Sequence, residues 1–245
     1  MIGMLSRLFR RNQAPAPFCS AVVAAAGSSR RMGGENKLLL PLDGVPVLVR
    51  TLLALESAQL VDEIVIATRE EDLLTIGDLC KLYGIRKPVK IVCGGETRQE
   101  SVLAAALECR EDAGYIAVHD GARPLVTAEM IDRVIRLAHR TNAAALAVPV
   151  KDTIKVVQDG KVVSTPNRET LRAIQTPQVF DAQLLRAALQ TAVENGDVLT
   201  DDCAAVERLG KEVYLAEGSY ENIKITTPED ICLAEELLRR REEPL

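Results

Sequence analysis

A segment rich in small and basic residues lies near the start of the chain, at residues 24–37, and reads AAAGSSRRMGGENK. Small side chains let the backbone approach a phosphate chain closely, and exposed backbone N–H groups in such a turn form a concavity that binds anions. Arg31 and Lys37 add the positive charge that a triphosphate requires. The segment matches neither the phosphate-binding loop GxxxxGK[ST] nor the dinucleotide fingerprint GxGxxG. It therefore predicts a triphosphate site of another kind.

A second group of candidate residues is HDGARP at 119–124, directly after an apolar run that reads as a strand. Asp120 then falls at the carboxyl end of a strand, which is where open α/β sheets bind ligands. Its carboxylate can help to hold hydrated Mg²⁺ or an acceptor hydroxyl, and Arg123 can make a two-pronged contact to a phosphate. His119 is expected to be a hydrogen-bonded structural residue rather than a catalyst.

Together with the basic loop, further segments in a fixed order resemble one enzyme family, the 2-C-methyl-D-erythritol 4-phosphate cytidylyltransferases. These segments are GGETRQESV (94–102), HDGARP (119–124), TPQ (176–178) with TDD (200–202), and ENIKIT (221–226). The resemblance runs from about Ser20 to the last predicted helix. The basic loop alone would also resemble a molybdenum-cofactor guanylyltransferase, but HDGARP together with ENIKIT is not expected there.

The resemblance implies an activity and a set of site residues. The activity is the joining of CTP to 2-C-methyl-D-erythritol 4-phosphate, with release of pyrophosphate, in isoprenoid precursor synthesis. The implied cofactor is Mg²⁺ or another divalent cation, held mainly through the triphosphate and water, with Asp120 as its candidate protein ligand. The catalytic residues would be Arg31, Lys37, Lys224 and Arg168; those that bind the nucleotide Ala25, Ala26, Gly27, Gly95, Glu96 and Ser101; and those that bind the acceptor Asp120, Arg123, Thr153, Arg168 and Thr176.

Lys224 has two readings. It lies in ENIKIT, which reads as a short apolar strand, and a lysine on such a strand ordinarily lies on a solvated face. The resemblance instead points its side chain at the reacting phosphate. No general base is expected, because a phosphate monoester has a second pKa of about 6 and is largely deprotonated at neutral pH.

Two other functions remain open at this stage. One is a cytidylyltransferase for another polyol phosphate, such as ribitol 5-phosphate, because the motifs of the two groups overlap. The other is a non-catalytic regulator that binds a nucleotide and keeps the fold. The full set of charged candidates favours an enzyme over this regulator.

The elements that must position these residues follow an alternating pattern. Apolar, β-branched runs alternate with helical stretches, which predicts repeated βα units and a mostly parallel sheet. The predicted strands are 20–26, 63–68, 89–93, 115–119 and 144–150, and the predicted helices lie near 46–58, 71–83, 97–109 and 127–140, with a last one opening at Pro228. With the resemblance, the expected fold class is α/β: a three-layer Rossmann-like nucleotidyltransferase fold with a mostly parallel sheet and an inserted β-hairpin arm.

The rhythm breaks at about residues 150–170. IKVVQ, then Asp159-Gly160, then KVVST predicts a β-hairpin, because Asp-Gly suits the positive φ angles of a two-residue turn. An isolated hairpin is at best marginally stable in water. The resemblance implies that this arm clasps a second subunit and forms a homodimer, and it leaves open which subunit supplies Arg168.

Composition sets the remaining expectations. A chain of 245 residues with 47% hydrophobic content supports one nucleotidyltransferase domain at 19–245, after a flexible basic N-terminal extension at 1–18. The net charge is −5, and six basic side chains stand against one acidic side chain within residues 1–37. Such a focused basic segment favours a small anion over nucleic acid. No run approaches the roughly 20 apolar residues of a membrane span. The six scattered cysteines argue against zinc or disulfides and for the cytoplasm.

Overall fold

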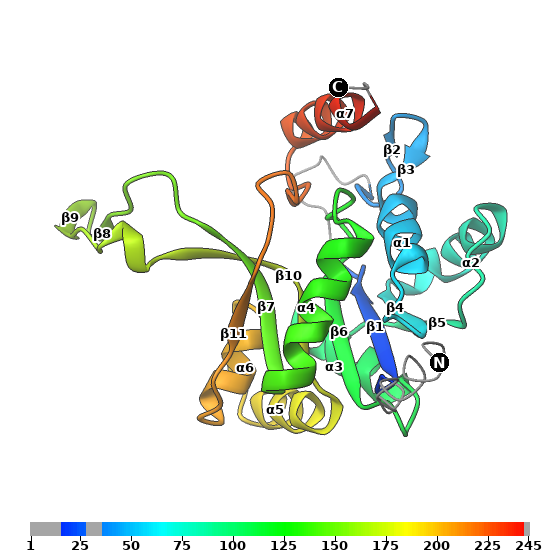
Figure 1. Cartoon of the computed structure of the whole chain (residues 1–245), viewed down its shortest axis with the longest axis horizontal. Helices are drawn as coiled ribbons and strands as arrows, with labels where there is room; N and C mark the ends of the chain where they lie inside the picture. The colour runs from blue at the N-terminus through cyan, green and yellow to red at the C-terminus, as the bar shows by residue number, and fades with distance from the viewer. Residues whose placement is uncertain (1–15, 28–35, 243–245) are drawn as a thin grey trace, which may run out of the picture.

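The computed structural model of the chain describes residues 16–27 and 36–242. Most of the predicted N-terminal extension, residues 1–15, lies outside the described residues, and so does Arg31 in the basic loop. The described residues form a body of helices around a central sheet, from which one arm projects (Figure 1).

The central sheet has seven strands in the order β11-β7-β10-β6-β1-β4-β5. Parallel pairing joins β1 to β4 and β6, β4 to β5, and β7 to β11, whereas β10 runs antiparallel to β6 and β7. The strands are Cys19–Ala24 (β1), Glu63–Thr68 (β4), Val89–Cys93 (β5), Tyr115–Asp120 (β6), Ala143–Pro149 (β7), Arg172–Asp181 (β10) and Tyr214–Glu217 (β11). The predicted mostly parallel sheet is confirmed.

All five predicted strands of the sheet are present, with bounds that shift by a residue or two. The sequence pattern did not predict β10 or β11. Residues 175–180 of β10 are buried but begin with Gln175, Thr176, Pro177 and Gln178, and most of β11 is exposed, so neither strand shows a continuous apolar run. The strand expected at 221–226 was wrong: these residues form no strand in the structure.

Helices cover both faces of the sheet (Figure 1). Their bounds are Val47–Ser57 (α1), Leu73–Leu82 (α2), Arg98–Glu108 (α3), Ala128–Thr141 (α4), Ala182–Glu194 (α5), Asp202–Arg208 (α6) and Pro228–Glu242 (α7), with single turns of 3₁₀-helix at Glu70–Asp72 (η2) and Arg168–Thr170 (η3). The apolar sides of α1, α2, α4 and α7 pack in one core cluster, and those of α3, α5 and α6 pack in another.

The strands feed these two clusters with alternate residues. On β1, Ala21 and Val23 belong to the cluster under α1 and α4, whereas Val22 belongs to the cluster under α3 and α5. Successive side chains of a strand point to opposite faces, so a strand that is apolar at every position is buried on both. The expected three-layer arrangement is confirmed.

Two helices that matter for the site begin at threonine caps. Thr97 precedes α3 and forms a capping box with Glu100, in which the Thr97 side chain accepts from the Glu100 N–H and the Glu100 carboxylate accepts from the Thr97 N–H. Thr127 caps α4 by accepting from the N–H of Met130. Each cap satisfies donors that a helix leaves unpaired, and so fixes where the helix begins.

The inserted hairpin is present and projects from the body (Figure 1). Its strands are Val156–Gln158 (β8) and Lys161–Ser164 (β9), joined by Asp159 at φ +50° and Gly160 at φ +75°. Every residue of both strands is exposed. A second small hairpin, Pro41–Leu42 (β2) with Val45–Pro46 (β3), leads into α1. Within the part of the chain that the structure describes, no helix is long and apolar enough to cross a membrane.

The two-sided core predicts unequal costs for two similar substitutions. Leu52 in α1 is fully buried, whereas Leu74 in α2 is 84% exposed. We expect Leu52→Ala to lower the free energy of unfolding by about 2–5 kcal/mol, because it leaves a cavity under the sheet. Leu74→Ala should change it by less than about 0.5 kcal/mol. Chemical denaturation of both variants measures these values, and equal costs would contradict the assigned packing.

Candidate active site

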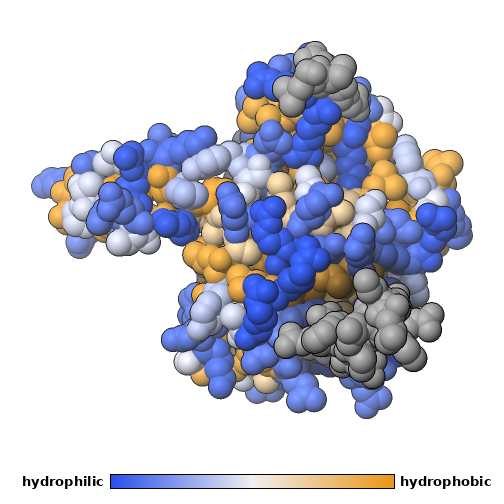
Figure 2. All heavy atoms as spheres, in the orientation of Figure 1, coloured by the Kyte–Doolittle hydropathy of each residue, from blue (hydrophilic) through white to orange (hydrophobic). Residues whose placement is uncertain are grey.

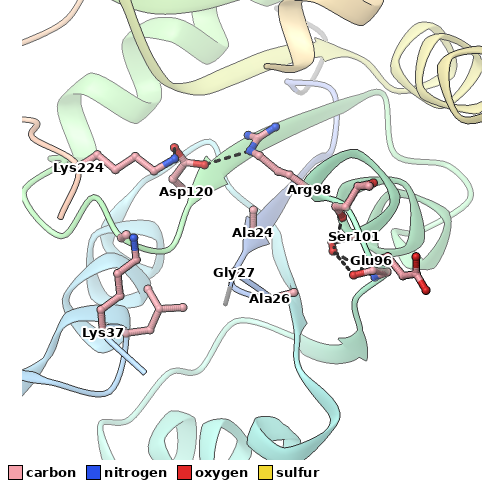
Figure 3. Close-up of a pocket in the computed structure, with 13 residues that line it drawn as sticks. Ala24, Ala26, Gly27, Lys37, Glu96, Arg98, Ser101, Asp120 and Lys224 are labelled. Carbon is pink, nitrogen blue, oxygen red and sulfur yellow. Dashed lines mark hydrogen bonds and ion pairs between the residues drawn. The ribbon is translucent and has the colours of Figure 1, made fainter. Parts of the chain in front are cut away.

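A pocket of about 350 Å³, here called the main pocket, lies at the carboxyl ends of β1 and β6 and beside the first turn of α3 (Figure 3). It combines small residues on one side with charged residues on the other. Its lining consists of Ala24, Ala26, Gly27, Lys37, Leu38, Gly95, Glu96, Thr97, Arg98, Ser101, Asp120, Ala122 and Lys224. The carboxyl edge of a parallel sheet is the expected place for a ligand.

One side of the main pocket is a tight turn between β5 and α3. A side-chain carbon at Gly94 would lie 2.6 Å from the Ala26 Cβ and 2.7 Å from Ser101 Oγ, so only glycine fits there. Ser101 is buried, accepts from the Gly95 N–H (3.1 Å), and donates to the Thr97 carbonyl (2.8 Å). Gly95 of this turn and Ser101 both line the pocket.

The predicted small loop after β1 contributes in part. Ala26 and Gly27, two of the predicted nucleotide-binding residues, line the main pocket. Ala25 is buried and does not line it; its N–H donates to the Ala67 carbonyl (2.8 Å). Arg31 lies outside the described residues.

The charged side of the main pocket brings together two lysines from opposite ends of the chain. Lys37 Nζ donates to the backbone carbonyl of Ile225 (2.8 Å), the residue that follows Lys224. Lys224 Nζ lies 2.9 Å from Asp120 Oδ2. Its side chain therefore turns inward, as the resemblance implied, and Figure 3 shows both lysines on the same side of the pocket as Asp120.

Asp120 is the centre of the charges. Its side chain is 9% exposed and faces Lys224, Arg98 (Nε to Oδ1, 3.3 Å) and Arg123 (Nε to Oδ2, 3.6 Å). Burial raises the pKa of Asp120, but the positive charges of Arg98, Lys224 and Arg123 outweigh it and hold that pKa well below its ordinary value. Asp120 is therefore ionised throughout the physiological range.

Sequence reasoning assigned no role to Arg98 or Asp202, although both lie in the quoted motifs. Two guanidinium nitrogens of Arg98 donate to the two carboxylate oxygens of Asp202, at 2.9 and 2.8 Å. Burial lowers the pKa of Arg98, but Asp202 and Asp120 raise it by more, so the guanidinium stays charged. No local sequence pattern links residues so far apart. The only signals of this pair in the sequence were an acid in TDD and an arginine in TRQES.

His119 has the structural role that was predicted. It is fully buried, and Nε2 contacts the Arg123 carbonyl (3.3 Å) while Nδ1 contacts Thr176 Oγ1 (3.0 Å). A carbonyl can only accept, so Nε2 carries the proton and Thr176 donates to Nδ1. Burial lowers the pKa of His119 to about 4, so the ring is neutral at neutral pH. Thr176 Oγ1 also accepts from the Asp120 N–H (3.1 Å).

A smaller hollow of about 130 Å³, here called the small recess, adjoins the main pocket. It is lined by Arg98, Asp120, Arg123, Ile174, Thr176, Gln178, Thr200, Asp201 and Lys224. Three of these residues, Arg98, Asp120 and Lys224, line the main pocket as well. Arg123 and Thr176, predicted to bind an acceptor, therefore do lie beside the charged cluster.

Two predicted acceptor residues do not join this site within one chain. Thr153 and Arg168 belong to the projecting arm and line neither hollow. Arg168 is exposed and donates to the Lys151 carbonyl (2.8 Å), also in the arm. Within one chain they therefore lie away from the site.

The described residues offer a metal few protein ligands. Among them, no group of three or more His, Cys, Asp or Glu side chains could hold an ion. Asp120 is the buried acid on the wall shared by the two hollows. One carboxylate with substrate phosphates is a usual set for Mg²⁺, so the residues present fit an ion carried by a triphosphate.

Comparison with known proteins agrees with this geometry. The family model for 2-C-methyl-D-erythritol 4-phosphate cytidylyltransferase matches residues 19–240. A curated protein of that name from Bacillus cytotoxicus is 47% identical over 218 residues, which are 89% of this chain and 96% of the relative. Another from Desulforamulus reducens is 47% identical over 229 residues, covering 90% of this chain and 96% of the relative.

Solved structures show the same fold. A 4-diphosphocytidyl-2C-methyl-D-erythritol synthase from Anaerococcus prevotii matches with a TM-score of 0.83 and 32% identity, over 92% of this chain and 100% of that one. The 2-C-methyl-D-erythritol 4-phosphate cytidylyltransferase from Thermus thermophilus matches with a TM-score of 0.72 and 32% identity, over 89% and 98% of the two chains. This chain therefore belongs to the 2-C-methyl-D-erythritol 4-phosphate cytidylyltransferase family.

Proposed function

We propose that the chain transfers the cytidylyl group of CTP to 2-C-methyl-D-erythritol 4-phosphate, giving 4-diphosphocytidyl-2-C-methyl-D-erythritol and pyrophosphate for isoprenoid precursor synthesis. Family membership supports the choice of substrates. The single observation that carries the chemistry is that the main pocket and the small recess share Asp120 and Lys224. Two anionic substrates in adjoining hollows would meet at that shared wall.

In this proposal, CTP lies in the main pocket. The cytosine ring packs on the turn at Gly95 and Glu96 next to Ser101, where backbone groups and a hydroxyl can read the edge of a base. The triphosphate follows Ala26 and Gly27 toward Lys37 and Lys224. These cations stabilise negative charge on the α-phosphate and on the departing pyrophosphate, and Arg31 would add to them.

The acceptor lies in the small recess, beside Arg123 and Thr176. An oxygen of its phosphate attacks the α-phosphorus of CTP in line, a new P–O bond forms, and the bond from the α-phosphorus to the bridging oxygen breaks. The electron pair leaves with pyrophosphate. The attacking phosphate is already mostly ionised at neutral pH, since its second pKa is about 6, so no side chain has to remove a proton. His119 is neutral and both of its ring nitrogens are hydrogen-bonded, which agrees with a reaction that needs no general base.

A divalent cation, Mg²⁺ by preference, belongs to the proposal. Oxygens of the triphosphate and water would hold most of it, and Asp120, whose two oxygens already contact Arg98, Lys224 and Arg123, would contact it through water. When bound, the ion supplies positive charge that neutralises the phosphates.

Assembly as a homodimer is also proposed, and the arm supports it. Exposed apolar side chains gather there: Ile154, Val156, Val157, Val162 and Val163, each at least 40% exposed. Figure 2 shows hydrophobic side chains among hydrophilic ones on the projecting arm. Contact with a second copy would cover these side chains and bring Thr153 and Arg168 to the neighbouring site. A cytoplasmic location fits the cysteines, because all six, each within the described residues, are free thiols.

The substrate proposal predicts the outcome of a simple assay. Purified protein with Mg²⁺ should release pyrophosphate from CTP in the presence of 2-C-methyl-D-erythritol 4-phosphate, and at least about tenfold more slowly from UTP, GTP or ATP. Ribitol 5-phosphate serves as the alternative acceptor. Release with ribitol 5-phosphate alone would move the chain to another polyol, and tight CTP binding without any release would indicate a regulator.

The electrostatic role of Lys37 predicts a large kinetic effect. Lys37→Ala should lower kcat by at least about 10²-fold, as the loss of one preorganised charge does at comparable sites. Lys81→Ala, a change at an exposed residue of α2, is the matched control. Thermal unfolding checks that the loss of the contact to Ile225 leaves the variant folded. Near-normal turnover would exclude Lys37 from the mechanism.

The proposed dimer predicts that the mass of the protein in solution halves when the arm becomes charged. Val157 and Val162 face each other across the hairpin. The double variant Val157→Asp/Val162→Asp should elute as a monomer in size-exclusion chromatography with light scattering, because burying those carboxylates in an interface is costly. Leu74→Asp on α2 should stay dimeric. A wild-type monomer at micromolar concentration would refute the dimer.

A further inference from the structure

The first turn of α3 holds an arginine where a cation is unfavourable. Arg98 is the first residue of the helix, directly after the cap Thr97. The N-terminus of a helix carries partial positive charge and favours acidic side chains. An arginine there needs partners from outside its own helix, and the structure supplies two carboxylates.

The guanidinium of Arg98 contacts both carboxylates. Two of its nitrogens form the two-pronged pair with Asp202, and the third, Nε, lies 3.3 Å from Asp120 Oδ1. The side chain of Asp202 is only 1% exposed and lines neither the main pocket nor the small recess. Asp202 is thus an anchor for Arg98 and not a contact for substrate.

A second contact strengthens the same connection. Gln99, the next residue of α3, donates to the Asp197 carbonyl (2.6 Å) and accepts from the Leu199 N–H (3.3 Å). The first turn of α3 and the segment 197–202 are therefore tied together at two successive positions. One side of this unit faces the main pocket, and the other side, at Thr200 and Asp201, faces the small recess.

Arg98 also affects which positive side chains compensate each oxygen of Asp120. Oδ1 of Asp120 contacts Arg98, whereas Oδ2 contacts Lys224 at 2.9 Å and Arg123 at 3.6 Å. Because each carboxylate oxygen contacts a positive side chain, the plane of the carboxylate is held in one orientation. Without Arg98, only Lys224 and Arg123 would compensate the charge of Asp120, and Lys224 would then pair more tightly with that carboxylate and be less free to contact a phosphate.

We propose that Arg98 is a positioning residue for the transfer reaction: anchored by Asp202, it fixes the carboxylate of Asp120 on the wall shared by the two hollows and takes part of the charge that would otherwise face Lys224. This inference rests on the proposed function. Arg98 acts through Asp120, so its contribution to kcat disappears when Asp120 is no longer charged.

A double-mutant cycle tests this dependence. Arg98→Met should lower kcat for CTP and 2-C-methyl-D-erythritol 4-phosphate by about 10–100-fold, the range expected when a reacting group is misplaced. Arg98→Lys keeps the charge but loses the two-pronged grip, so it should recover only part of that loss. In an Asp120→Asn background, Arg98→Met should change kcat by less than about threefold. A loss as large as in the wild-type background would overturn the proposal.

A second variant separates positioning from folding. Arg98→Met alone leaves Asp202 buried without a partner and is expected to lower the melting temperature. Arg98→Met/Asp202→Leu removes both charges and should recover the melting temperature while kcat stays low. Recovery of kcat together with stability would mean that the pair has a purely structural role. Arg110→Met, just past the other end of α3, is the control and should leave kcat unchanged.

The wild-type protein in the same assay keeps the two proposals apart. If it releases pyrophosphate and Arg98→Met turns over at the wild-type rate, the positioning role fails and the proposed function stands. If the wild-type protein is inactive with CTP and 2-C-methyl-D-erythritol 4-phosphate, the proposed function fails and the positioning role fails with it.

Discussion

One buried negative charge organises the site. Asp120 lies at the end of β6 with a side chain that is 9% exposed, and it is surrounded by Arg98, Arg123 and Lys224. An ionised carboxylate taken out of water is stable only when nearby charges and hydrogen bonds compensate for the lost solvation. The three cations come from α3, from the loop after β6, and from the segment before α7. Compensation of this single charge therefore requires the first turn of α3 and the segment before α7 to meet the end of β6.

The sheet places that charge where substrates can reach it. Parallel strands end at one edge, and β1, β6 and the turn after β5 bring small residues, an acid and a glycine turn to that edge. The reversed strand β10 carries Thr176 and Gln178 alongside β6 and so closes the small recess. Charged groups thus form the wall that the two hollows share, which suits a reaction between two polyanions.

The arm follows different physics from the body. Its strands β8 and β9 have no buried residue, and its valines are exposed to solvent. A hairpin without a core gains little from its own hydrogen bonds, so its apolar surface is unexplained within one chain. The same segment carries Thr153 and Arg168, the two acceptor candidates that the single chain leaves away from the site. A second copy would account for both observations.

Much of this protein could be predicted from sequence because the relevant signals are local. Continuous apolar runs gave β1, β4, β5, β6 and β7, Thr97 and Thr127 cap the helices that follow them, and Asp159-Gly160 turns the hairpin. Strands β10 and β11, which have mixed exposure, gave no such signal. The apolar residues within 221–226 predicted a strand that the structure does not contain. No local pattern predicted the pairing of Arg98 with Asp202 or the inward direction of Lys224, which only the family resemblance implied. These contacts join residues about a hundred positions apart, and only the packed sheet determines which charges share a wall.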